Sequence, residues 1–258
     1  MMGGVFVFLG TGGSMGIPVI GCSCDVCQSD SPFNKRLRSS AWITYDDQQF
    51  IIDVGPDFRQ QCLKFQIKAI DGVLITHAHY DHIAAIDDLR PLTFRNPPLP
   101  VLLSNDTAEE VKLRCYYLLK PDPVLSLPSR LHLEIFDQES GIVDFQGVPI
   151  QYVTYLQSGM KVNGYKIGNL AYLTDIKEFS PTIFEQIKDV KYLIISSLRF
   201  TASPLHFSID EAIDFSRKVN AEQVWLTHIS HELEHHQTNA YLPSNIRVAY
   251  DGLKIEFN

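Results

Sequence analysis

A cluster of metal-ligating side chains lies in the first third of the sequence. His77, His79, Asp81 and His82 fall within six residues, directly after the apolar run 72–75. They therefore stand where a buried strand leaves the core, which is where functional side chains concentrate. Imidazole and carboxylate groups together suit borderline divalent ions such as Zn, Mn or Fe. The segment predicts a metal site rather than a solvated polar loop.

The spacing of these ligands suggests hydrolytic chemistry. In an extended segment His77 and His79 project from the same side. Asp81 and His82 are adjacent and can serve a second ion where the chain turns into a helix. A pair of ions about 3.5–4 Å apart can hold a bridging water and lower its pKa toward neutrality. We therefore expect a catalytic centre to which Asp81 contributes.

A second cluster consists of thiols in a loop at about 21–28. Cys22, Cys24 and Cys27 lie within six residues, and alternation with a following turn can bring all three together. Three thiolates need a fourth ligand to close a tetrahedral zinc site. His231, three residues after His228, is the best candidate. We predict a structural zinc here rather than three surface thiols.

One further motif has the spacing of a zinc-protease helix. Residues 231–235 read His-Glu-Leu-Glu-His, and on a helix the two histidines would share one face. The segment follows an apolar strand pattern, however, and no third zinc ligand is evident downstream. It would also leave the cluster at His77 unexplained. We therefore reject the protease interpretation and expect His235 and His236 to face solvent.

The motif at residues 77–82 resembles the H-x-H-x-D-H signature of the metallo-β-lactamase superfamily in every ligand position. The segment 50–55, with Asp53 and Gly55, is similar to the family's strand ending in Asp-x-Gly. The resemblance runs from residue 9 to 252 and implies a four-layer αββα sandwich. It also implies two active-site divalent ions, which can be Zn, Mn or Fe. Their ligands would be His77, His79, Asp81, His82, Asp175 and His228.

One family landmark is missing from this chain. Family members usually offer a further His to the first metal, shortly before the bridging Asp, and here that place falls on Gln157. A neutral amide oxygen is a weaker ligand than imidazole. The first ion, left with His77, His79 and Asp175, is then expected to bind more weakly than the second. Substrate tuning is the other interpretation of Gln157.

The Gly-rich segment 9–18, followed by Gly21-Cys22, resembles a subgroup, the phosphoribosyl cyclic phosphodiesterases of phosphonate breakdown and their relatives. The resemblance implies a structural zinc on the Cys triplet and His231, which would hold the His228 loop in register. It also implies that His206 contacts the phosphate or protonates the leaving oxygen. Arg36 and Arg38 fall near the subgroup's phosphate pocket, and Arg suits phosphate.

The elements that must position these residues alternate along the chain. Four helical patterns are expected at 56–65, 107–119, 180–187 and 208–219, and those beginning at Thr107 and Ser208 open with capping boxes. The pattern favours two sheets covered by helices in one α/β domain, residues 1–258. Short β-rich runs occur at 5–9, 42–45, 50–53, 72–76, 101–104, 131–136, 150–155, 171–174, 192–196, 224–227 and 246–250.

Composition restricts the function further. The 258 residues carry a net charge of −8, which argues against an extended nucleic-acid partner. No apolar run reaches the roughly 18 residues of a membrane span, and the start lacks a secretory pattern. We therefore expect a cytoplasmic protein with reduced thiols, no membrane partner and, by general frequency, a homodimer.

Together these features predict a metal-dependent hydrolase, a phosphodiesterase acting on a small cyclic or nucleotide-like phosphate ester. A tRNA 3′-end endonuclease shares the His77 motif but needs a basic RNA-gripping insertion, and none is visible. A lactam or thioester hydrolase does not explain the Cys triplet. A degenerate, non-catalytic metal-binding module is the remaining alternative, and Gln157 motivates it.

Overall fold

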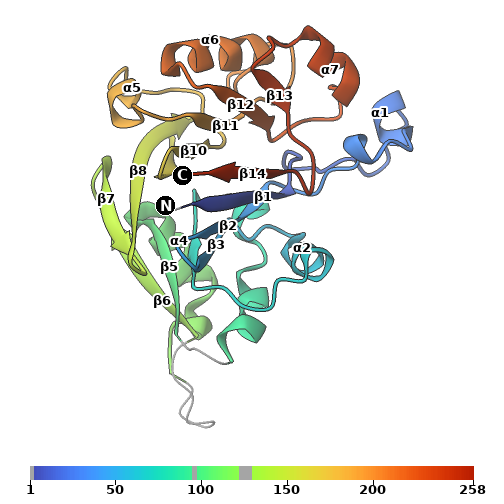
Figure 1. The fold of residues 1–258 in the computed structure, drawn as a ribbon. Helices are drawn as coiled ribbons and strands as arrows, with labels where there is room; N and C mark the ends of the chain where they lie inside the picture. The colour runs from blue at the N-terminus through green and yellow to red at the C-terminus, as the bar shows by residue number, and fades with distance from the viewer. Residues whose placement is uncertain (1–2, 95–97, 122–129) are drawn as a thin grey trace.

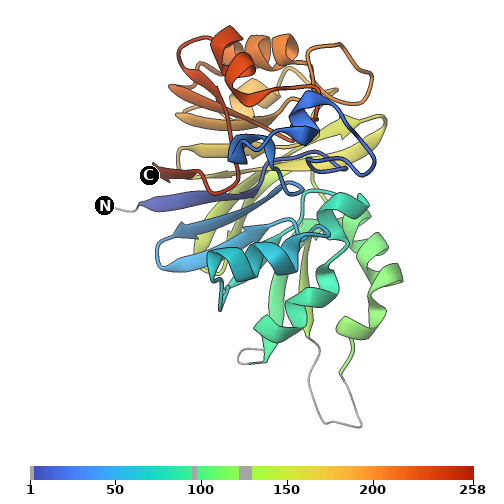
Figure 2. The ribbon, with the colours of Figure 1, turned by 90° about the vertical axis from the view of Figure 1, so that its right-hand side faces the viewer.

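The computed structural model describes residues 3–94, 98–121 and 130–258. Two seven-stranded sheets pack face to face, and helices cover the outer face of each (Figure 1). The view turned by 90° shows the same layers from the side, with the two ends of the chain close together at one edge (Figure 2). The αββα sandwich expected from the sequence is confirmed.

The first sheet holds the N-terminal half of the chain and the last strand. Its centre is parallel, from β3 through β4 and β5 to β6. The strands, in their order across the sheet, are β14 (Lys254–Phe257), β1 (Gly4–Gly10), β2 (Ser40–Tyr45), β3 (Gln48–Ile52), β4 (Gly72–Leu74), β5 (Leu99–Ser104) and β6 (Leu131–Phe136).

The second sheet holds the C-terminal half, and its strands from β10 to β13 are parallel. The strands in order are β13 (Ile246–Val248), β12 (Gln223–Thr227), β11 (Tyr192–Ser196), β10 (Leu170–Leu173), β9 (Met160–Ile167), β8 (Val148–Gln157) and β7 (Ser140–Phe145).

The helices are short. They are α1 (Asp25–Gln28), α2 (Phe58–Phe65), α3 (Tyr80–Ile83), α4 (Asn105–Arg114), α5 (Ile183–Gln186), α6 (Ile209–Val219) and α7 (His235–Tyr241), with 3₁₀ turns at Pro32–Asn34, Ile86–Thr93 and Tyr116–Leu118. Among the described residues, none of these helices is both long and apolar enough to cross a membrane.

Three apolar clusters hold the layers together. The cluster between the sheets is rich in aromatic side chains, among them Phe6, Phe50 and Tyr172. The other two lie between each sheet and its helices. Aromatic side chains bury large apolar areas, so they dominate the energetics of such a core. The rigid sandwich places the carboxyl ends of the parallel strands where their loops can carry function.

The local predictions succeed where a cap is decisive. Helix α6 carries the expected capping box, in which the Ser208 hydroxyl accepts from the backbone of Glu211 and the Glu211 carboxylate accepts in return. Helix α4, in contrast, begins two residues before Thr107, because the Ser104 hydroxyl accepts from the Thr107 backbone N–H and is the true cap. The capping box expected at Thr107 is therefore wrong.

Strands β7, β9 and β14 have no counterpart among the expected runs. In β9, Gly164 interrupts the apolar pattern, yet this glycine allows close packing: a Cβ there would lie 2.2 Å from a Leu173 methyl carbon. A glycine inside a strand often marks such a close approach.

Candidate metal centre

Strand ends from both sheets deliver the predicted ligands to one place. His77 to His82 follow β4, Asp175 follows β10 and His228 follows β12. Asp53, just after β3, joins them. Asp53, Asp175 and His228 have positive φ values of 61°, 55° and 57°. Such backbone costs about 1–3 kcal/mol for a non-glycine residue and is concentrated at functional sites.

One group of ligands is centred on the Asp175 carboxylate. Its Oδ2 lies 3.1 Å from His82 Nε2 and its Oδ1 lies 3.3 Å from His228 Nε2. Asp81 Oδ2 lies 3.4 and 3.5 Å from the same two nitrogens. Ligand atoms about 2.0–2.1 Å from one tetrahedral ion are about 3.3 Å apart. These four side chains therefore have the spacing of a single coordination shell.

The remaining predicted ligands are His77 and His79, which lie beside each other. His77 Nε2 is 3.0 Å from His79 Nδ1, and ligand atoms of His77, His82 and Asp175 fall within 4.8 Å of one another. His77 is buried, whereas His79 is exposed. All six residues predicted to hold active-site metals are thus brought together, with Asp175 shared between two groups.

The buried nitrogens of this centre fit divalent cations. His82 Nε2 and both ring nitrogens of His228 are buried without a hydrogen-bond partner. Carboxylate oxygens lie within 3.5 Å of both Nε2 atoms, but not in hydrogen-bonding directions. Buried polar atoms left unpaired are costly and rare. Lone pairs that converge on a common point, instead of on each other, are what metal coordination requires.

Two neighbouring residues orient the imidazoles. Asp53, fully buried, accepts from His82 Nδ1 at 2.7 Å and from the Thr76 backbone and hydroxyl at 2.8 Å. The Thr76 hydroxyl lies 2.9 Å from His77 Nδ1 and can accept its proton. Both contacts place the ring proton on Nδ1 and leave the Nε2 lone pair free. We expected Asp53 only as a family landmark and did not expect Thr76 to contribute.

Burial and charge act in opposite directions on the acidic ligands. Burial alone would raise the pKa of Asp81, but His82 and His228 hold it below its usual range. The pKa of Asp175 is likewise well below its usual value, because His228 and His82 outweigh burial. Both carboxylates therefore stay ionised and ready to bind a cation.

The surroundings shift the pKa values of His77 and His82 in opposite directions. Burial lowers the pKa of His77, and the charge of His82 adds to this. For His82, burial is outweighed by Asp53, Asp81 and Asp175, which raise its pKa well above the usual value. Metal binding must therefore displace a proton from His82, since a ligating imidazole is neutral.

Gln157 lies beside Asp175, where the family pattern has a histidine. Its amide Nε2 donates to Asp175 Oδ1 at 3.2 Å and lies 3.1 Å from His206 Nε2. Its buried Oε1 has no hydrogen-bond partner. His206 Nδ1 is 3.1 Å from Asp175 Oδ1. The amide thus connects the ligand cluster to His206, the residue predicted to handle protons.

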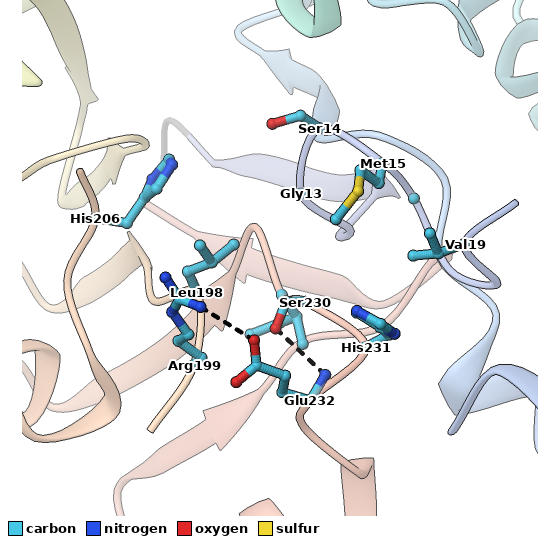
Figure 3. A pocket seen from close by; sticks show the side chains of 12 residues that line it. Gly13, Ser14, Met15, Val19, Leu198, Arg199, His206, Ser230, His231 and Glu232 are labelled. Atoms are coloured by element: carbon cyan, nitrogen blue, oxygen red, sulfur yellow. Dashed lines mark hydrogen bonds and ion pairs between the residues drawn. The ribbon is translucent and has the colours of Figure 1, made fainter. Parts of the chain in front are cut away.

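A chain of hollows gives access to the centre. The central hollow, of about 440 Å³, is lined by Ser14, His79, Gln157, Ser158, Met160, Asp175, Leu205 and His206. A second hollow, of about 220 Å³, shares Ser14 and His206 with it (Figure 3). A third, of about 420 Å³, shares His79 and Met160. Two of the predicted ligands, His79 and Asp175, therefore line the central hollow, through which the cluster is reached.

The three cysteines and His231 lie together, where the sequence predicted a structural zinc site. The sulfur atoms of Cys22, Cys24 and Cys27 lie 3.3, 3.5 and 3.6 Å from His231 Nδ1. An ideal tetrahedral zinc site has sulfur–nitrogen edges of about 3.5 Å. The backbone N–H of Cys27 lowers the pKa of Cys24 to about 6, with a contribution from His231. A thiolate is thereby favoured, and these four residues fit a zinc ion.

The loop that precedes the cysteine cluster in the chain pairs through its backbone with Ile229, the residue after His228. Gly13 N donates to Ile229 O at 3.0 Å, and Ile229 N donates to Thr11 O at 2.9 Å. A Cβ on Gly13 would lie 3.2 Å from the ring of His228, so the absent side chain allows the loop to approach that ligand closely. The contacts support the expected role in holding the His228 loop.

The two arginines do not behave alike, and the expectation for Arg36 is corrected. Its side chain is only 2% exposed and donates to the Thr11 hydroxyl at 2.7 Å and to Ala249 O at 2.6 Å. Arg36 lines none of the three hollows described above. Its Nη1 and Nη2 engage buried partners from distant segments, so the side chain joins segments of the fold and does not reach these hollows, and its buried Nε has no partner.

Arg38 is half-buried and, like Arg36, lines none of the three hollows. Its Nη1 pairs with Asp57 at 3.0 Å, and its Nε donates to Ser14 O at 3.3 Å. The side chain therefore supports the loop that carries Ser14. A direct contact between Arg38 and substrate remains a prediction.

The structure also explains the H-E-x-x-H sequence. His231 belongs to the cysteine cluster, and α7 begins only at His235, so the two histidines do not share a helix face. His235 is buried, stacks on Phe33 at 4.7 Å and lies 3.1 Å from Arg36 Nη2. The expectation that His235 faces solvent is wrong, because Phe33 and Arg36 pack against its ring and bury it. His236 is exposed, as expected.

Comparisons with known proteins agree with this geometry. Residues 48–229 match the model of the beta-lactamase superfamily domain. A solved structure described as a new diphosphatase from the PhnP family is 34% identical, with a TM-score of 0.90, and the match covers 100% of this chain and 98% of that one. Human tRNase Z, short form, is 15% identical with a TM-score of 0.70, over 97% of this chain and 98% of that one.

One curated relative is named for a transferase and not for a hydrolase. A Porphyromonas gingivalis protein named octanoyltransferase is 34% identical over 252 residues, which are 96% of this chain and 50% of that protein. The chain thus spans about half the length of this relative, and the activity in the relative's name refers to the whole of that protein. The family match, which includes the His77 motif and Asp175, places this chain in the metallo-β-lactamase superfamily.

Proposed function

We propose that this protein is a phosphodiesterase that uses two divalent ions to hydrolyse a small phosphate diester. The main support is the ligand cluster around Asp175, in which buried imidazole nitrogens have no hydrogen-bond partner. The likeness over the whole chain to a PhnP-family diphosphatase supports phosphorus as the centre attacked. Zn, Mn and Fe are the ions that such a set of nitrogen and oxygen ligands accepts.

The chain's own residues would divide the work. Asp81, His82, His228 and Asp175 would hold one ion, and His77, His79 and Asp175 the other. When bound, such ions neutralise phosphoryl oxygens and lower the pKa of water. Asp53 and Thr76 keep His82 and His77 in the ligating tautomer.

His206 is proposed to protonate the leaving oxygen. It lines both the central hollow and the second hollow. Its Nδ1 lies 3.1 Å from Asp175 Oδ1, and its Nε2 lies 3.1 Å from the Gln157 amide nitrogen, so the substrate oxygen would have to displace that amide contact to take a proton from Nε2. The amide of Gln157 packs against the same edge of the ring and limits its rotation.

Small diesters suit this site better than RNA. The central hollow is about 440 Å³, within the roughly 300–1,000 Å³ of small-molecule pockets. The net charge of −8 opposes a polyanion. The likeness to tRNase Z, at 15% identity, concerns the fold alone.

The test is turnover of bis(p-nitrophenyl) phosphate by protein loaded with Mn or Zn. The proposal expects metal-dependent release of p-nitrophenol that is lost in Asp81→Ala, because Asp81 is a proposed metal ligand. Absence of turnover with either ion on any diester would favour a non-catalytic module. Preferential cleavage of a 3′-extended tRNA precursor would favour the endonuclease.

A further inference from the structure

The cysteine cluster holds its sulfur atoms close enough to react with one another. The sulfurs of Cys22, Cys24 and Cys27 and a ring nitrogen of His231 all lie within 4.8 Å of one another. All five cysteines of the chain are free thiols in the structure. Thiolates that bind zinc are also the nucleophiles of disulfide chemistry. The cluster therefore has the groups for a second chemistry besides metal binding.

Local backbone structure selects one pair of these thiols. Cys24 is the N-cap of α1, and Cys27 lies inside the same helix. The backbone N–H of Gln28 donates to Cys24 O at 3.0 Å, so the turn that joins the two cysteines is already closed. Residues three apart on a helical turn have Cβ atoms about 5–6 Å apart, and a disulfide needs about 3.5–4.5 Å. A shift of about 1–2 Å at the N-cap, which is outside the helix, is enough to close the bond.

The two thiols differ in their access to solvent. Cys24 is half-buried, whereas Cys27 is only 4% exposed. The Cys27 sulfur accepts from the Val19 backbone N–H at 3.3 Å, and Lys35 Nζ donates to Cys27 O at 3.3 Å. A dissolved oxidant therefore reaches Cys24 first, and Cys27 is placed as the thiol that reacts with oxidised Cys24. Reactive cysteines are typically exposed in part and often have such a second thiol beside them.

The remaining cysteines provide a comparison within the chain. Burial raises the pKa of Cys62 to about 12 and also raises the pKa of Cys115. Both pack against the apolar cluster between the first sheet and its helices. A protonated thiol is a poor nucleophile, so these two side chains are expected to resist oxidation.

We propose that Cys24 and Cys27 form a reversible oxidative modification site, at which a hydroperoxide converts the two thiolates into a disulfide and the zinc ion of the cluster is released. The Cys24 sulfur attacks one peroxide oxygen, the oxygen–oxygen bond breaks, and a sulfenic acid forms. The Cys27 sulfur then attacks the Cys24 sulfur and the sulfur–oxygen bond breaks. The two sulfurs lose two electrons, and hydrogen peroxide takes these with two protons and leaves as two waters.

Zinc leaves as the divalent ion, because it has no redox chemistry of its own. Only Cys22 and His231 remain as ligands, two of the four that a tetrahedral site requires. His231 follows His228 by three residues. Ile229 keeps its backbone pairing with the N-terminal loop, so the segment 228–231 retains its path but loses its anchor. Oxidation is therefore expected to loosen the segment that carries the ligand His228.

The test uses protein loaded with manganese at the active-site ligands and zinc at the cysteines, because thiolates select Zn over Mn. After treatment with hydrogen peroxide, released zinc is measured with a chromogenic chelator and remaining thiols by alkylation in denaturant. We expect about one zinc ion per molecule, loss of two of the five thiols, and a peptide in which Cys24 is joined to Cys27. Dithiothreitol and added zinc should restore the thiols and the bound zinc.

Two variants separate this site from the rest of the molecule. The double variant Cys62→Ala, Cys115→Ala is the matched control and should release zinc like the unmodified protein, since its disulfide pair is intact. Asp81→Ala should also release the same zinc, although its active-site ion is weakened. The result therefore does not depend on the proposed function.

Retention of zinc in peroxide that oxidises free cysteine completely would overturn the proposal. A disulfide formed through Cys22 would do the same, and so would oxidation to a sulfinic acid that dithiothreitol does not reverse. The link to His228 is tested by amide hydrogen exchange, which should become faster at residues 229–231 after oxidation. Unchanged exchange there would overturn that link.

Discussion

Asp53→Asn tests the orientation of His82 most sharply. In the structure one carboxylate serves three donors: Oδ2 accepts from His82 Nδ1 and the Thr76 hydroxyl, and Oδ1 accepts from the Thr76 backbone. Asparagine keeps the shape but offers one oxygen and one NH₂ group. One side of the residue must therefore lose its hydrogen bonds.

Either orientation of the amide carries a cost. If the oxygen faces the Thr76 backbone, the NH₂ group faces His82 Nδ1 and moves the ring proton to Nε2, the nitrogen that should bind metal. If the oxygen faces His82, the buried Thr76 backbone N–H is left unpaired, at about 1–3 kcal/mol. That range corresponds to about 5–150-fold in metal affinity and includes the roughly 10–100-fold that is usual for losing an orienting partner.

The assay is a competition titration of Zn against a chromogenic chelator, on protein whose fold is checked by circular dichroism. Asp251→Asn is the matched control. Asp251 is partly buried and also accepts from a threonine hydroxyl and a backbone N–H, those of Thr11 and Leu37. The reasoning is refuted if Asp53→Asn binds metal as tightly as the unmodified protein, or if Asp251→Asn shows the same loss.

Four other predictions follow from the site. Gln157→His should restore the missing imidazole and convert a weakly held first ion into a tight one; two equally tight active-site ions in the unmodified protein by calorimetry would contradict this. Cys24→Ser should lower both zinc content and turnover, and an unchanged number of zinc ions per molecule would refute the structural zinc site. Arg36→Met should cost about 2–5 kcal/mol in urea unfolding, because buried partners lose their donors, while turnover per folded molecule is retained; a selective loss of turnover would return Arg36 to substrate binding. Active-site metal affinity should fall as pH falls, because the raised pKa of His82 means that a bound proton must be displaced; affinity independent of pH from about 5 to 8 would contradict this.

The sequence predicts the ligands better than their support. His77 to His82 are close in the chain, so their spacing alone indicates a shared site. Asp175 and His228 are distant, and only the family resemblance places them with the others. Thr76 carries no signal of its own, because its role depends on where its hydroxyl falls between Asp53 and His77.

The errors have a common physical origin in tertiary contacts. Arg36 and Arg38 are equally suited to phosphate by residue type, and only packing shows that Thr11 and Ala249 occupy the donors of Arg36. His235 is polar and near a turn, yet stacking on Phe33 buries it. Strand β9 was missed because Gly164 breaks the apolar alternation for the sake of close packing with Leu173.

The central claim is that Asp175 joins strand ends of both sheets into one metal-binding centre. Elemental analysis after dialysis, for the unmodified protein and for Asp175→Ala, tests it most directly. We expect Asp175→Ala to lose the active-site ions and to keep the zinc of the cysteine cluster, whose ligands are untouched. Identical metal content in the two proteins, with both folded, would contradict it.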